Sequence, residues 1–129
     1  MKIDRIDHFV LTVASIDATC DFYQRVLGFE RHSPANKPTS LSFGRQKINV
    51  HQTGRTFDPR ARQPTPGAAD FCLVTHTPIE AVLAHLERHG VAIEKGPVDR
   101  MGATGAMVSI YFRDPDGNLV EVSRYCDAN

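Results

Sequence analysis

Residues 7–13 read DHFVLTV, and residues 69–75 read ADFCLVT. When the two stretches are laid over each other at a shift of 62 positions, Phe9 falls on Phe71. Apolar residues alternate with other residues in both, which is the pattern of a strand with one buried face. Self-similarity at a fixed spacing predicts two copies of one structural unit.

A helical pattern that ends in glycine follows each of these strands. The first helix is expected to begin with Ser15 as its N-cap and to stop at Gly28. The second is expected to begin at residues 77–80 (TPIE), a capping box with proline at the first helical position, and to end at Gly90. Strand and helix therefore recur together.

Each half then continues with a predicted hairpin. The hairpins consist of strands 41–43 and 48–51 around a turn at 44–47, and of strands 108–112 and 119–122 around a turn at 114–118. The second turn contains proline followed by Asp-Gly, which is strong turn chemistry. Matching the two hairpins places His51 on Glu121, at a shift of 70. The predicted order is β-α-β-β-β, twice, in an α+β protein.

The chain of 129 residues is 41% apolar and 23% charged, which is ordinary globular composition. We divide it into module one (1–53), a linker (54–67) with three prolines and two glycines, and module two (68–129). Half of such a chain has little core of its own, so we expect the modules to form a single domain.

Several classes of function are disfavoured. Fifteen basic and fifteen acidic residues give no net charge, so nucleic acid is not an expected partner. The longest apolar runs are too short to cross a bilayer, and the N-terminus does not resemble a secretion signal. The three cysteines show no paired spacing. We expect free thiols and a cytoplasmic location.

Four positions related by the repeat carry metal-binding side chain types: His8, His51, Asp70 and Glu121. Imidazoles and carboxylates are common ligands of divalent transition metals. An unpaired charge beside the neighbouring Val and Leu residues is costly, and a cation relieves that cost. If both modules face one cavity, the four side chains form a candidate metal site.

The end motifs resemble those of the vicinal oxygen chelate superfamily, which includes glyoxalase I, bleomycin-resistance proteins, fosfomycin-resistance enzymes and extradiol dioxygenases. The resemblance rests on Asp7-His8, on residues 15–17 and 21–29, and on residues 112–121 (FRDPDGNLVE). It covers nearly the whole chain. It implies two βαβββ modules that form a U-shaped, partly closed mixed sheet around a central cavity with a metal.

The resemblance also implies roles for the four residues. His8 and Glu121 match metal ligands of the family directly, and His51 stands where bacterial glyoxalase I has a glutamate ligand. Asp70 departs from the family, which usually has histidine there, and this counts against dioxygenase and fosfomycin chemistry. The expected metal is Zn, Ni, Co, Mn or Fe(II), and Glu121 or Asp70 is the candidate catalytic group that moves a proton.

The leading functional hypothesis is a metal-dependent lyase or isomerase of the glyoxalase I type, whose small substrate chelates the metal through adjacent oxygens. The alternatives are an Fe(II) extradiol dioxygenase and a non-catalytic protein that binds a small molecule. Small members of the family commonly form homodimers, and we expect the same here. Further candidates for substrate contact are Tyr111, Arg45, Arg55, Arg60, Arg62 and Arg113.

Overall fold

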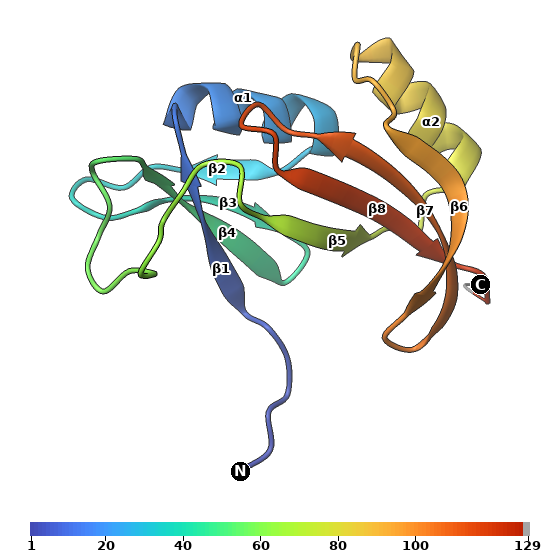
Figure 1. Cartoon of the computed structure of the whole chain (residues 1–129), viewed down its shortest axis with the longest axis horizontal. Coiled ribbons are helices and arrows are strands. Elements are labelled where there is room, and N and C mark those ends of the chain that lie inside the picture. The colour runs from blue at the N-terminus through green and yellow to red at the C-terminus, as the bar shows by residue number, and fades with distance from the viewer. Residues whose placement is uncertain (128–129) are drawn as a thin grey trace. The chain divides into compact units, whose positions relative to one another are not determined.

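The computed structural model describes residues 1–127 and divides the chain into two compact units, residues 1–68 and the part from residue 69 onward (Figure 1). Each unit has the order β-α-β-β-β, so the predicted α+β class and the predicted repeat are confirmed. No helix among the described residues is long and apolar enough to span a membrane.

Unit 1 is a four-stranded mixed sheet with one helix. Its elements are β1 (His8–Val13), α1 (Ile16–Leu27), β2 (Glu30–His32), β3 (Thr39–Phe43) and β4 (Gln46–Gln52). The strand order is β1-β4-β3-β2. Strand β1 runs parallel to β4, while the β2–β3 and β3–β4 pairs are antiparallel. The first strand of the unit therefore lies beside its last.

Unit 2 repeats this topology. Its elements are β5 (Asp70–Val74), α2 (Ile79–Arg88), β6 (Lys95–Gly102), β7 (Gly105–Arg113) and β8 (Leu119–Tyr125). The strand order is β5-β8-β7-β6, with β5 parallel to β8 and the other pairs antiparallel. A register shift between Lys95 and Val98 interrupts the β6–β7 ladder. Both units thus bring the start of their first strand next to their last strand.

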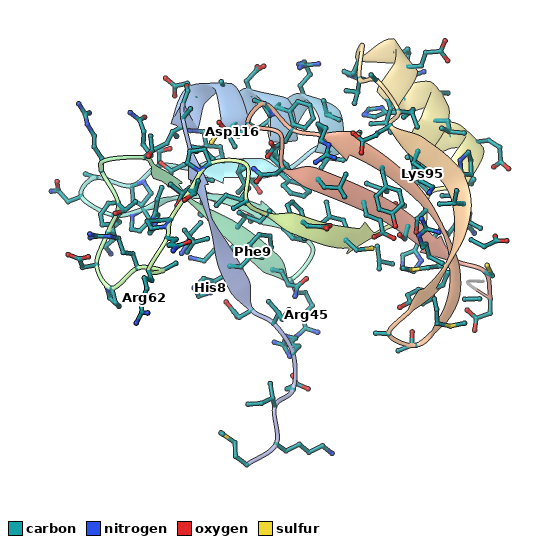
Figure 2. All side chains as sticks on the ribbon, in the orientation of Figure 1. His8, Phe9, Arg45, Arg62, Lys95 and Asp116 are labelled. Carbon is teal, nitrogen blue, oxygen red and sulfur yellow. The ribbon has the colours of Figure 1, made fainter. Side chains whose placement is uncertain are left out.

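The core of unit 1 is built from alternate residues of its strands. Leu11 on β1 and both Ile48 and Val50 on β4 are almost completely buried, as is Tyr23 of helix α1. His8 belongs to the opposite face of β1, because successive side chains of a strand point to opposite sides (Figure 2). The face without the buried apolar row is where the candidate residues of this unit lie.

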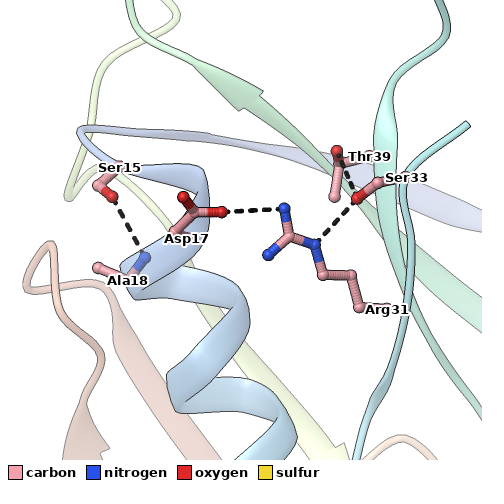
Figure 3. Close-up of polar contacts among 6 residues, drawn as sticks. All are labelled: Ser15, Asp17, Ala18, Arg31, Ser33 and Thr39. Carbon is pink, nitrogen blue, oxygen red and sulfur yellow. Dashed lines mark hydrogen bonds and ion pairs between the residues drawn. The ribbon is translucent and has the colours of Figure 1, made fainter. Parts of the chain in front are cut away.

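Helix α1 begins and ends as predicted. The Ala18 amide donates to Ser15 Oγ at 3.2 Å, which satisfies one of the free amides at the helix N-terminus (Figure 3). Gly28 ends the helix at φ 71°, a left-handed conformation that glycine adopts without steric cost. Asp17, in the first turn, pairs with Arg31 of β2 at 3.0 Å and ties the helix to the sheet.

The capping box predicted for the second helix is wrong. Pro78 itself is the N-cap of α2 and has an extended backbone (φ −55°, ψ 142°), and no side chain of the described residues 1–127 caps the helix. The helix therefore begins at Ile79, and Glu80 is its second residue rather than its third. From that position Glu80 does not complete the reciprocal bond with a residue at the N-cap.

The predicted match of His51 with Glu121 is also wrong. Asn49 pairs with Val10 on β1, and Glu121 pairs with Cys72 at the equivalent place on β5. Glu121 therefore corresponds to Asn49, at a shift of 72 rather than 70. The predicted and observed alignments differ by two residues, and side chains two positions apart share a face of the strand, so His51 lies on the same face of β4 as Asn49.

Candidate functional site

His8 stands at the start of β1, and its side chain is 44% exposed (Figure 2). Its ring Nδ1 lies 2.8 Å from Asp7 Oδ1. This hydrogen bond is the main reason why the pKa of Asp7 is lowered. Because an ionised carboxylate only accepts hydrogen bonds, Nδ1 carries the proton, and the lone pair of a neutral ring is then on Nε2. A carboxylate orients many metal-binding histidines in this way.

Strand β4 presents two polar side chains on the same face. His51 is 5% exposed, and its ring centroid lies 5.4 Å from that of Phe57. Burial lowers the pKa of His51, which favours the neutral imidazole that metals bind. Asn49 Oδ1 is buried and has no hydrogen-bond partner among the residues that the structure describes. Both side chains thus offer an acceptor atom on this face.

The register between β1 and β4 sets the distances of His51 and Asn49 from His8. His8 pairs with Lys47 and His51 with Thr12, so the two histidines are four positions apart, about 13 Å along the strand. Asn49 is only two positions from His8, or about 7 Å. Unit 1 therefore places the amide of Asn49 nearer to His8 than the second imidazole.

In unit 2, Asp70 and Glu121 have the spacing of His8 and Asn49. Asp70 begins β5 and pairs with Leu119, and Glu121 is two positions further along β8. The start of β5 is held in place because the Ala69 amide donates to Asn118 Oδ1 at 2.9 Å. Unit 2 therefore places two carboxylates on one face of adjacent strands.

A buried turn supports this arrangement. Asp114 Oδ1 accepts from the amides of Asp116 and Asn118 at 3.0 and 2.9 Å, and Asp114 Oδ2 accepts from Asn118 Nδ2 at 2.8 Å. The Asp-Pro-Asp-Gly-Asn motif predicted a turn here, and the structure shows how the turn is built. Through Asn118, the same turn positions the residue before Asp70.

A hydroxyl and thiol cluster adjoins Glu121. Ser123 Oγ donates to Glu121 Oε2 at 3.2 Å, and it lies 2.6 Å from Ser109 Oγ and 3.1 Å from Cys72 Sγ. The pKa of Cys72 is raised, first by burial and also by the Glu121 charge. Strand alternation from Glu121 and Tyr111 places both serines on this face, but neither the serines nor Cys72 was predicted to be a site residue.

The remaining candidates differ in their surroundings. Tyr111 pairs with Glu121 across β7 and β8, and Arg100 Nε, which was not anticipated, donates to its hydroxyl at 2.9 Å. Arg113 forms two 2.9 Å hydrogen bonds with Glu94. Arg60 pairs with Asp58. All five arginine candidates are exposed, including Arg45, Arg55 and Arg62.

Each unit offers donors of the types that divalent cations bind. His8 has a fixed tautomer, Glu121 has one oxygen held by Ser123, and Asn49 has a buried acceptor without a partner. Imidazole and carboxylate donors suit the borderline divalent metals. Within the described part of each unit, no three His, Cys, Asp or Glu side chains form a group that could hold a metal ion.

Comparison with known proteins identifies the family. The family model of the Glyoxalase/Bleomycin resistance protein/Dioxygenase superfamily matches residues 5–122. The chain belongs to this superfamily. Among its relatives, the virulence protein STM3117 of Salmonella typhimurium is 53% identical over 97% of this chain and 87% of its own length. The crystal structure of that protein superimposes with a TM-score of 0.94, covering 97% of this chain and 99% of the other.

Two further relatives extend the comparison. The glyoxalase domain-containing protein RDO1 of Mycosarcoma maydis is 45% identical over 99% of this chain and 72% of its own length. Lactoylglutathione lyase from Agrobacterium tumefaciens is 23% identical, with a TM-score of 0.74 over 96% of both chains. At that identity the likeness to the lyase shows the glyoxalase-superfamily fold alone.

Proposed function

We propose that this protein is a divalent-metal-dependent lyase or isomerase of the glyoxalase I type, acting on a small substrate with two adjacent oxygens. Its metal would be Zn, Ni, Co, Mn or Fe(II). The proposed ligands are His8 and His51 of unit 1 and Asp70 and Glu121 of unit 2. When bound, such a cation supplies Lewis-acid stabilisation to substrate oxygens.

One observation carries the proposal. In both units a donor begins the first strand, and a second donor lies two positions further along the adjacent last strand. The pairs are His8 with Asn49 and Asp70 with Glu121. Of the two polar side chains on β4, we propose His51 rather than Asn49 as the ligand, because a neutral imidazole binds these metals better than an amide oxygen.

The protein's own residues account for the rest of the chemistry. Asp7 orients the ring of His8, and Ser123 orients the carboxylate of Glu121. Asp70, or Glu121, accepts the proton on the carbon next to the substrate carbonyl and returns it to the neighbouring carbon. The isomerisation consumes no oxidant or reductant. Tyr111, beside Glu121 in the ladder, is a candidate contact for the substrate.

Elemental analysis of protein purified without chelator tests the metal. We expect about one divalent ion per chain in the wild type and little in His8→Ala and Glu121→Gln. His85→Ala is the control, because it removes an imidazole on helix α2 that is not among the proposed ligands and whose ring lies beside that of His89, with centroids 4.3 Å apart. Metal content that is unchanged by the two site variants would remove the proposed metal centre.

Activity assays separate the functional alternatives. Protein loaded with nickel, zinc, cobalt or manganese is expected to turn over thiol adducts of α-oxoaldehydes. Ring cleavage of catechols after anaerobic iron loading would instead indicate an extradiol dioxygenase, in which His8, His51 and Glu121 form the two-histidine, one-carboxylate set. Tight binding of a small molecule by metal-free protein, without turnover, would indicate a binding protein.

We also propose that the chain forms a homodimer. Ile3 and Ile6 precede β1 and are 73% and 67% exposed, so the segment before the first strand presents apolar surface. Covering such surface by a second copy removes it from water. Light scattering over a range of concentrations should give twice the chain mass, and the monomer mass at every concentration would refute the dimer.

A further inference from the structure

The cluster next to Glu121 has a fixed direction of hydrogen bonding. Ser123 has a single hydroxyl proton, and the carboxylate of Glu121 only accepts. The Ser123 proton therefore goes to Glu121 Oε2, 3.2 Å away. Ser109, whose Oγ lies 2.6 Å from Ser123 Oγ, must then donate to a lone pair of Ser123, and Cys72 Sγ lies 3.1 Å from the same oxygen.

The two serines of the cluster are buried in the sheet of unit 2. Ser109 and Ser123 are completely buried, and they face each other as register partners on β7 and β8. A buried hydroxyl must find partners, because an unpaired one costs free energy. The hydrogen bond that Ser109 donates to Ser123 satisfies an acceptor of Ser123 and polarises its hydroxyl toward the carboxylate. Among the described residues, the side chain of Ser123 hydrogen-bonds to Glu121 as well as to this cluster.

We propose that Ser123, backed by Ser109 and Cys72, is a positioning residue that holds Oε2 of Glu121 so that Oε1 serves as the metal donor. The inference rests on the proposed function, in which Glu121 is a ligand. Residues that hold a ligating side chain restrict its rotamers before the metal arrives, so less freedom is lost on binding. Loss of such a partner typically weakens metal affinity by about 10–100-fold.

The test is the dissociation constant for Co²⁺ and Zn²⁺, measured by competition with a coloured chelator. We expect Ser123→Ala to bind about 10–100-fold more weakly than wild type, and its Co²⁺ absorption bands to change in position or intensity. Ser123→Thr keeps a hydroxyl and should retain most of the affinity. Ser109→Ala, which removes one supporting donor, should weaken binding less than Ser123→Ala.

Ser15→Ala is the matched control. It removes the same hydroxyl group and destabilises helix α1 through its cap, but among the described residues Ser15 forms its side-chain hydrogen bond with Ala18 and not with a candidate ligand. Its metal affinity should equal that of wild type, which separates a local effect from general loss of stability. If Ser123→Ala does not fold, Ser109→Ala and Ser123→Thr decide between the outcomes.

The results distinguish a failure of the proposed metal centre from a failure of the positioning role of Ser123. Wild-type protein that binds neither ion would overturn the proposed metal centre itself. Wild-type protein that binds both ions, with Ser123→Ala and Ser109→Ala binding equally well, would overturn the positioning role alone. Weakening in Ser15→Ala as large as in Ser123→Ala would also overturn it, because the loss would then follow stability.

Discussion

Asn49 and Glu121 occupy the same position in their respective sheets, each two places beyond the residue that pairs with the start of the first strand. The side chain at this position is a neutral amide in unit 1 and a carboxylate in unit 2. In unit 1 the buried amide oxygen has no partner among the described residues, and the imidazole of His51 lies further along the same face. The two units therefore offer donors of unequal strength.

Paired variants on β4 test which donor binds. We expect His51→Ala to lower metal affinity at least tenfold, because it removes the stronger ligand. Asn49→Ala, on the same face, should lower it less. Both dissociation constants can be measured by chelator competition. The reverse order would assign the ligand role to Asn49 and would agree with the shorter spacing from His8.

Asp7 provides a second test. Asp7→Ala removes the acceptor that fixes the tautomer and orientation of the His8 ring. We expect about a tenfold loss of metal affinity, at the lower end of the range for such partners because the pair is exposed. Asp4→Ala removes an equal charge that contacts Arg5 instead, and it serves as the control. Equal affinities of the two variants would contradict the role of Asp7.

The buried ring of His51 makes a prediction about pH. Burial lowers its folded-state pKa below the ordinary value of 6.5, so between these two values the unfolded chain binds more protons at this residue. Stability from this group is therefore present at neutral pH and lost as the pH falls through that window.

Urea unfolding at pH 7.5 and 5.5, with chelator present, measures this effect. Acidification should cost the wild type more free energy of unfolding than His51→Gln, in which the titrating group is absent. The other histidines contribute to both proteins and cancel in the difference. An equal acid sensitivity would show that His51 titrates in the folded protein as it does in the unfolded chain.

Asn118 is expected to be important for stability. It is 1% exposed, and Asn118→Ala would leave the Ala69 amide and Asp114 Oδ2 without this partner. We expect a loss of about 2–4 kcal/mol in the free energy of unfolding, because each buried group left unsatisfied costs about 1–3 kcal/mol. Thr65→Ala, at an exposed site, should change stability by less than about 0.5 kcal/mol. Similar free energies of unfolding for both variants would show that the hydrogen bonds of Asn118 do not stabilise the fold.

Local features of the chain were predictable because their causes are local. Ser15 and Gly28 bound a helix through their own backbone and side-chain chemistry, and the alternation around Phe9 and Phe71 identified the two opening strands. The same alternation placed His8, His51 and Glu121 on faces without the buried apolar row. Helix α2 was predicted correctly as a helix, but its first residue depended on the backbone conformation of Pro78.

Register was decided only in the folded sheets. Alternation repeats every two residues, so it assigns a face but does not distinguish a shift of 70 from one of 72. Hydrogen bonding between β1 and β4, and between β5 and β8, selects the shift of 72. Asn49 in unit 1 therefore corresponds to Glu121 in unit 2. The bonds among Cys72, Ser109 and Ser123 likewise arise only when three strands are side by side, since these residues are distant along the chain.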